Sequence, residues 1–186
     1  MSNQGFAMSR TVFARLTVAA IAALFLSACV QSQAPLITDA QPLLGQQFEV
    51  HLYEEFVDNK ASGFHASVYQ WKDGQYVRAS GLAQDAKRFV AMPLAGNDFV
   101  IQSSDENGKV FLYWLGRRLT PGVYQIFGIN EMDADEATRK AICGDRPSDI
   151  CWVTGREQLL TLARATAAKP PRNAALGVVL SRPAAF

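Results

Sequence analysis

The chain has 186 residues, of which 49% are hydrophobic and 10% aromatic, a composition typical of a globular protein rather than a disordered one. Its 18 Lys and Arg residues nearly balance its 17 Asp and Glu residues, which gives a formal net charge of +1. Nucleic-acid binding calls for a clustered basic face, so we expect no nucleic-acid partner.

The first 28 residues have the features of a secretory signal peptide. Arg10 and Arg15 precede an apolar block at residues 16–29, and no acidic residue occurs before Asp39. The block is shorter than the roughly twenty residues with which a helix crosses a bilayer, so a membrane-spanning helix is not expected. The sequence therefore predicts that the chain is exported and that residues 1–28 are removed.

The apolar block ends with Leu26-Ser27-Ala28-Cys29, and this stretch resembles the lipobox of bacterial lipoproteins. The resemblance implies cleavage before Cys29, a diacylglyceryl group on its sulfur and an acyl chain such as palmitate on the new amino end. Several acyl chains on one residue hold a protein durably at a membrane. Because Val30 rather than an aspartate follows the cysteine, the resemblance favours the outer membrane, facing the periplasm, over the inner membrane. Either Met1 or Met8 can be the start, and the alternative is an ordinary signal peptide with a chance cysteine.

The residues after the signal are rich in Gln, Ser and Pro and have no regular period. We expect residues 29–45 to be the lipidated cysteine and a tether that lifts the domain away from the lipid head groups. The alternative is that the apolar side chains of this segment pack on the domain. These side chains belong to Leu36, Ile37, Leu43 and Leu44.

Residues 46–182 form a single domain in this interpretation, because the mature chain has the usual size of one domain. Alternating or turn-bounded apolar runs predict about seven strands before residue 130 and a last strand near the C-terminus. They cover residues 47–53, 64–71, 75–79, 88–92, 97–102, 109–115, 123–129 and 175–180. Asp73-Gly74 supplies the turn of a tight hairpin. Short connections favour antiparallel neighbours.

Two helices are expected after the strands. Residues 133–142 carry acidic residues in the first turn and basic residues in the last, which suits the helix dipole. Thr154 and Glu157 have the spacing of a capping box before an apolar helix that Pro170 ends. The predicted fold is therefore α+β, with a mainly antiparallel sheet of about six to eight strands and two short helices packed on it.

Cys143 and Cys151 are the thiols that remain when Cys29 is lipidated. An exported protein meets an oxidising compartment, so we expect a disulfide between them. The alternatives are a redox pair or a metal site. A metal would need two further ligands, and the spacing of the two cysteines is not that of a thiol-exchange motif.

His51 and His65 are the two histidines of the chain, and both lie at the polar positions of predicted strands. If these strands pair, the histidines could approach each other and bind a metal ion with nearby carboxylates. The candidate carboxylates are Glu49, Glu54, Glu55 and Asp58. The alternative, which we favour because no ligand spacing supports a metal site, is that both histidines are solvated on an open sheet face.

Tyr69, Trp71 and Tyr76 surround the predicted hairpin and form a candidate interaction surface. The alternative is cross-strand packing, which aromatic residues on neighbouring strands give in any case.

The sequence supports no catalytic residue and no cofactor. It has no Gly-x-Ser-x-Gly turn, no phosphate-binding glycine loop and no His-Glu-x-x-His motif. The leading hypothesis is a lipid-anchored, non-catalytic binding or assembly module that meets the membrane through its lipid and an envelope protein or polymer as partner. The alternatives are a metal-dependent periplasmic hydrolase, or an inhibitor or immunity protein that presents the loop between Cys143 and Cys151.

Overall fold

The computed structural model describes residues 30–53, 64–82, 86–105, 107–145, 150–171 and 175–181. Its strands are β1 (Val30–Ser32), β2 (Gln47–Tyr53), β3 (Phe64–Lys72), β4 (Gln75–Ser80), β5 (Arg88–Ala95), β6 (Asp98–Ser104), β7 (Phe111–Thr120), β8 (Val123–Gly128), β9 (Cys151–Trp152) and β10 (Ala175–Ser181). Its helices are the 3-10 helix η2 (Glu131–Asp133), α2 (Glu136–Cys143) and α3 (Arg156–Ala167).

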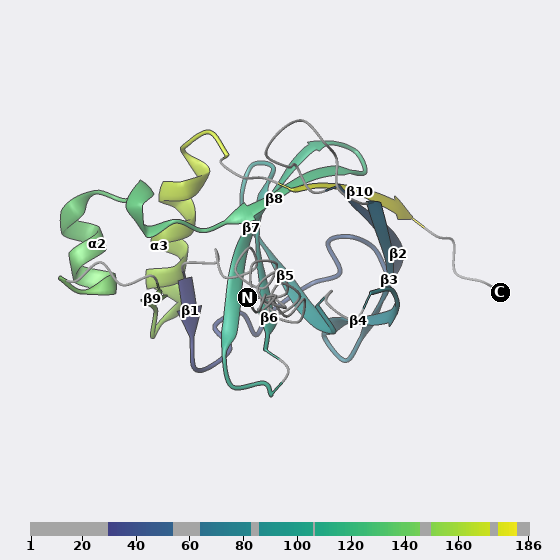
Figure 1. Cartoon of the computed structure of the whole chain (residues 1–186), viewed down its shortest axis with the longest axis horizontal. Helices are drawn as coiled ribbons and strands as arrows, with labels where there is room; N and C mark the ends of the chain where they lie inside the picture. Colours follow the sequence, from purple (N-terminus) through teal and green to yellow (C-terminus); the bar gives the residue numbers. More distant parts are fainter. Residues whose placement is uncertain are drawn as a thin grey trace, which may run out of the picture.

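Eight of the strands close into an antiparallel barrel, which Figure 1 shows as a ring seen end-on. Each strand from β2 to β7 pairs with the next one along the chain, and β10 pairs with both β8 and β2. The predicted antiparallel sheet with two helices is confirmed in this coarse sense. Closure into a barrel goes beyond the prediction, and it removes the unpaired edges that an open sheet would expose.

The first predicted hairpin has the expected geometry. β3 and β4 are joined by Asp73 with φ of 50° and Gly74 with φ of 77°. Two successive residues with positive φ form the turn that matches the twist of a two-residue hairpin, and glycine adopts this conformation without strain.

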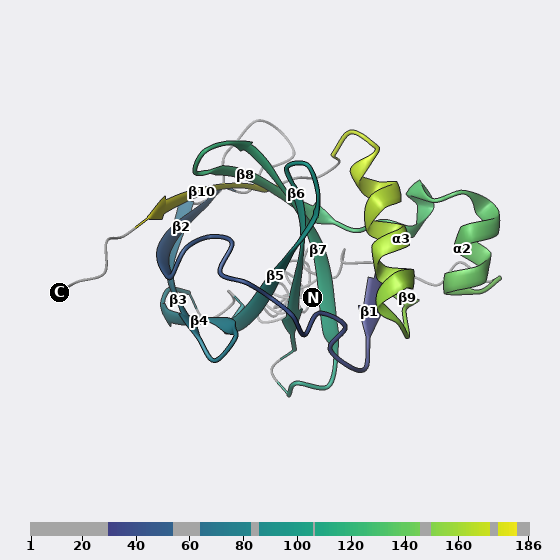
Figure 2. The ribbon, with the colours of Figure 1, turned by 180° about the vertical axis from the view of Figure 1, so that it is seen from behind.

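The helices lie outside the barrel. α3 packs against the wall at β5 and β7, and α2 lies beyond α3, next to η2 and β9 (Figures 1 and 2). A hydrophobic core fills the space between the barrel wall and α3. Its fully buried members include Val100, Tyr113 and Leu115 from the wall and Leu159 and Leu162 from the helix. Burial on one face of β7 against α3 and on the other inside the barrel explains why this strand is apolar on both sides.

An ion pair fixes the end of α3 on this wall. Arg117 of β7 donates to both carboxylate oxygens of Asp98 of β6, at 2.7 and 3.0 Å, and also to the carbonyl of Ala167, at 2.5 Å. The Asp98 carboxylate raises the pKa of Arg117, so that the guanidinium keeps its charge at this site. The last carbonyls of a helix need such donors.

Residues 30–45 pack on the domain, in contrast to the tether expected for residues 29–45. Val30–Ser32 forms β1, which is buried and pairs with β7 on one side and β9 on the other. Ile37 is 2% exposed, and Leu44 packs on the interior of the barrel. The segment between β1 and β2 crosses one end of the barrel (Figure 2). Apolar burial outweighs the flexibility that Gln, Ser and Pro suggested.

A buried hydrogen-bond network holds this segment. The side-chain oxygen of Gln102 accepts from the backbone N–H groups of Leu36 and Ile37, at 2.8 and 2.9 Å, and from the Tyr113 hydroxyl, at 3.2 Å. Ser32 and the Tyr113 hydroxyl lie 2.7 Å apart. The network satisfies polar backbone that would otherwise be buried without partners.

The two helices begin one to three residues later than the sequence predicts. Asp135 is the N-cap of α2 and accepts from the Thr138 N–H at 2.9 Å. Gly155, not Thr154, is the N-cap of α3, and the predicted capping box is absent there. Gln158 instead accepts from the Thr154 N–H at 2.8 Å, so a glutamine one turn into the helix takes the expected role of Glu157.

Candidate functional site in the barrel interior

The inner face of the barrel can be identified from its outer face. Val100, Tyr113 and Phe127 point outward, because they belong to the core under α3. Side chains alternate along a strand, so their neighbours on β6, β7 and β8 point inward. These inward residues include Phe99, Ile101, Leu112, Trp114, Tyr124 and Ile126. Cross-strand pairing agrees, since Ile101 lies opposite Trp114.

Aromatic side chains fill the interior near the tight hairpins. Phe48 of β2 and Tyr76 of β4 are 1% and 0% exposed, and their rings lie 5.1 Å apart in an edge-to-face arrangement. Tyr69 and Phe89 complete this cluster, with ring centroids 5.0 Å apart. Such contacts add to the stabilisation from burial. The aromatic cluster of Phe48, Tyr69, Tyr76 and Phe89 is therefore packed core.

Tyr76 also binds the segment that crosses this end of the barrel. Its hydroxyl accepts from the Leu44 N–H at 2.8 Å and donates to the Gly45 carbonyl at 3.1 Å. Burial raises the pKa of Tyr76 to about 12, because the phenolate would lose its solvation. Together the aromatic cluster and Leu44 close the hairpin end.

The opposite wall is closed at the same level by Phe99. Its ring lies over Gly116 of β7, where a Cβ atom would come within 2.2 Å of the ring, and it meets the Tyr124 ring at 5.7 Å. Phe99 and Gly116 are cross-strand partners. A glycine at an inward position therefore makes room for a large ring.

Farther from the hairpins, the inward side chains are less completely covered. Ile101, Leu112, Trp114 and Ile126 are partly buried, although each faces the inside of the barrel. Small residues occupy neighbouring inward positions on the surrounding strands. They are Ser67, Ala91, Ser103 and Gly128. We call Ile101, Leu112, Trp114 and Ile126, the partly buried large apolar residues beside these small ones, the interior apolar wall.

This wall has the chemistry of a site for an apolar group. An eight-stranded barrel is just wide enough to be filled by side chains or to hold one small ligand. Ligand pockets are concave and mainly apolar, with a few polar groups that fix orientation. Here the hairpin end is packed, the wall is apolar, and the buried Ser67 and Ser103 contribute hydroxyls on the inner face.

The predicted interaction surface is largely inside the barrel. Tyr69 is 4% exposed and Tyr76 is fully buried, and Trp71 packs on Tyr76 with ring centroids 4.8 Å apart. The alternative of cross-strand packing describes these residues. Closure of the sheet turned the face that was expected to be open into the inner face of the barrel.

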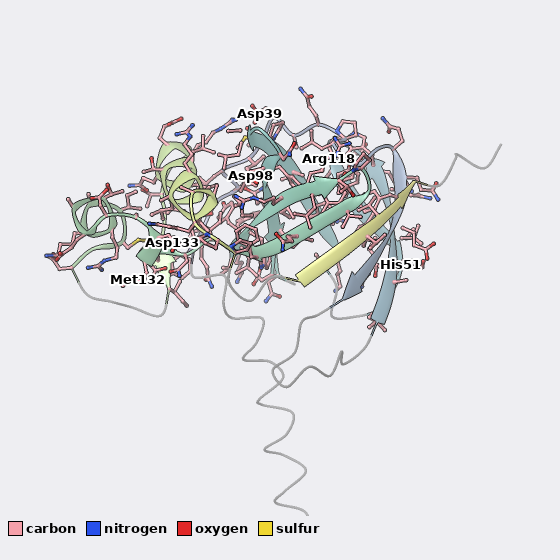
Figure 3. All side chains as sticks on the ribbon, turned by 90° about the horizontal axis from the view of Figure 1, so that it is seen from above. Asp39, His51, Asp98, Arg118, Met132 and Asp133 are labelled. Atoms are coloured by element: carbon pink, nitrogen blue, oxygen red, sulfur yellow. A yellow bond between two sulfur atoms is a disulfide. The ribbon has the colours of Figure 1, made fainter. Side chains whose placement is uncertain are left out.

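The two histidine positions do not come together as a site. The register of β2 and β3 pairs His51 with Ala66 and His65 with Leu52, so the two positions fall on alternate faces of the sheet. His51 lies on the outside of β2, away from the helices (Figure 3), and its Nε2 atom is 2.7 Å from Glu49 Oε1. Glu54, Glu55 and Asp58 lie outside the described residues.

Cys143 and Cys151 form a disulfide that joins the end of α2 to β9, with Cα atoms 4.9 Å apart. Cys151 is buried in the core under α3. The middle of the loop between the cysteines, residues 146–149, lies outside the described residues, as does Cys29. The disulfide connects β9 to α2, and β9 in turn pairs with β1, so the bond links both short strands to the helices.

Two further features bear on function within the described ranges. Nowhere in them do three or more His, Cys, Asp or Glu side chains gather as a metal ion would require. None of their helices combines the length and the hydropathy needed to span a bilayer.

The interior apolar wall was missed by sequence reasoning. Its residues alternate with outward residues that are equally apolar, so the pattern showed a covered strand but not what lies on each side. The usable signal was the set of small residues at the inward positions opposite the wall residues, namely Ala91, Ser103 and Gly128.

No known family model matches this chain, and neither characterised proteins nor solved structures contain a significant match to it.

Proposed function

We propose that this protein is a lipid-anchored, non-catalytic binding module of the cell envelope and that its barrel holds the apolar part of a small amphipathic molecule. The observation that carries the proposal is the incomplete burial of the interior apolar wall. A barrel that served only as a stable core would gain by burying these side chains completely, since each buried methylene contributes about 0.8 kcal/mol.

The class of ligand follows from the wall. Ile101, Leu112, Trp114 and Ile126 offer no charge and no hydrogen-bond acceptor to a ligand, so an acyl chain or a similarly apolar group fits best. The aromatic cluster and Phe99 limit the depth to which such a group can enter from the other end. A polar head would then remain at the end of the barrel away from the tight hairpins.

We also propose that the protein is held at the outer membrane by a lipid on Cys29. The lipobox-like stretch before Val30 supports lipidation of Cys29 and an address at the outer membrane, facing the periplasm. A site for acyl chains suits a protein held beside a membrane, because its ligand is then concentrated around it. Intact-mass measurement of the mature protein tests the anchor, and an unmodified Cys29 would contradict it.

The binding site is tested by titrating the exported Cys29→Ser variant, which carries no lipid of its own, with a fluorescent fatty acid. We expect saturable one-to-one binding. Ile126→Glu places a charge on the interior apolar wall and should weaken binding at least about tenfold, because burying an unpaired charge is costly.

Gln125→Glu is the matched control, since it adds the same charge at the adjacent, outward position of β8. It should bind the fatty acid as the parent does. Equal losses in both variants, with both still folded by circular dichroism, would contradict an interior site. So would the lack of saturable binding in the parent.

A further inference from the structure

We propose that the exposed surface beside β1, which includes residues 33 and 34 and the side chains of Trp152 and Thr154, lies directly on the lipid bilayer that holds the acyl chains of Cys29, with Trp152 in the head-group region. This inference rests on the proposed lipidation of Cys29. It goes beyond it, because it gives the domain one orientation on the membrane.

The first step is the lack of free chain between anchor and domain. Val30 is fully buried, and it pairs with Cys151 in the parallel ladder of β1 and β9. Cys29 is covalently bonded to this buried residue, so no free segment separates the proposed anchor from the described domain. A lipid on Cys29 therefore draws the surface around β1 to the membrane.

The second step is the rigidity of this attachment. β1 lies between β7 and β9, and the Ser32 hydroxyl forms a hydrogen bond of 2.7 Å with the Tyr113 hydroxyl. Gln102 then holds the backbone of Leu36 and Ile37. The disulfide of Cys151 fixes β9 to α2. Residues 30–37 cannot rotate relative to the barrel unless these interactions break, so the anchor sets the orientation of the barrel on the membrane.

The third step is the chemistry of the surface beside the anchor. Trp152 is 42% exposed and lies opposite Gln31 in the ladder. Adjacent strands are about 4.8 Å apart, so the Cα atoms of Val30 and Trp152 lie within roughly 9 Å of each other. Tryptophan is favoured at the boundary between lipid tails and water.

A shallow hollow of about 330 Å³ adjoins Trp152, and its mainly apolar lining includes Ala34, Leu36 and Val153. None of the described residues that line it is charged. Approach of a bilayer would therefore bury apolar surface without the cost of desolvating a charge. A bilayer is the occupant that the covalent anchor already brings to this place, which favours lipid over a protein partner.

The test uses the full lipidated protein, reconstituted in vesicles of phosphatidylethanolamine and phosphatidylglycerol that contain phospholipids brominated in their acyl chains. Bromine quenches tryptophan only at short range. We expect the protein to float with the vesicles and its emission to be quenched. Trp152→Phe should lose most of this quenching, whereas Trp71→Phe, the matched change at the hairpin end of the barrel, should keep it.

Each other outcome decides against the inference. Flotation with equal quenching in Trp152→Phe and the parent would show that the surface does not meet the lipid, while the anchor stands. Loss of quenching in Trp71→Phe instead would show that the hairpin end of the barrel, and not Trp152, meets the lipid. Failure to float would overturn the anchor and this orientation together.

Discussion

Individual inward residues decide which parts of this barrel are filled. Phe99 can lie across the interior because its cross-strand partner is Gly116, and the aromatic cluster packs because four rings meet at one level. Ile101, Leu112 and Ile126, which have small neighbours, are only partly buried. The size of a few side chains therefore separates packed core from candidate site.

Gly116→Ala tests this description of the packed end. The new Cβ atom would come within 2.2 Å of the Phe99 ring, so we expect a loss of about 1 to 3 kcal/mol in the free energy of unfolding measured in urea. In a Phe99→Leu background the same change should cost less, because the obstructing ring is gone. Additive costs would show that the two residues do not compete for the same space.

Tyr76 gives the protein a predicted sensitivity to alkali. Its pKa is raised by burial to about 12, so the folded state holds this proton more firmly than the unfolded state does, whose pKa is about 10. The resulting stabilisation is fully present below pH 10 and is lost as the pH rises to 12, at about 1.4 kcal/mol per pH unit. Burial raises the pKa of Tyr113 in the same direction.

Urea unfolding between pH 9 and pH 12 measures this loss. Tyr76→Phe should be less stable at pH 9 but should show a shallower decline above pH 10. An identical decline in the variant would exclude Tyr76 as its source.

At the scale of elements, the sequence predicted the turns and strands that depend on neighbouring residues alone. The Asp73-Gly74 hairpin and the strands on either side of it are as expected, because positive φ and alternation are local properties. The prediction for the faces of β3 was wrong. Alternation assigned the position of His65, and with it that of Tyr69, to an open polar face. The register with β2 instead places this side of β3 on the inner face, where Tyr69 pairs with Phe48.

Gln102 connects two elements, and Gln102→Leu should release residues 30–37 from the barrel. The change leaves the buried N–H groups of Leu36 and Ile37 without an acceptor, which should cost about 2 to 4 kcal/mol. Tyr113→Phe removes only the hydroxyl and should cost about 1 kcal/mol. Hydrogen exchange at the two amides should quicken in the first variant. Unchanged exchange would contradict the role of Gln102 as the clamp.

The disulfide stabilises a second connection, between α2 and β9. Replacing Cys143 and Cys151 with serine should lower the free energy of unfolding by about 2 to 3 kcal/mol, because the closed loop is short. Chemical denaturation of the oxidised parent and of the variant should show this loss as a lower denaturation midpoint for the variant. Equal midpoints would show that packing alone holds β9.

At the scale of the whole molecule, sequence reasoning could not reach barrel closure. Closure depends on β10 pairing with both β2 and β8, and these partners are far apart in the chain. The packing of residues 30–45 could not be predicted either, since it depends on hydrogen bonds to Gln102 and Tyr76. These residues are far away in the sequence, and no local pattern links them to that segment. The candidate site arises from closure, so it was missed with it.

The most direct test of the central claim is photolabelling with a fatty acid that carries a diazirine on its chain, followed by mapping of the labelled residues by mass spectrometry. We expect labels at alternate positions on β6, β7 and β8: Ile101, Leu112, Trp114 and Ile126. Their outward neighbours, among them Val100, Tyr113 and Phe127, should stay unlabelled. Labels on these outward neighbours, or none inside the barrel, would contradict the proposal that the interior holds the ligand.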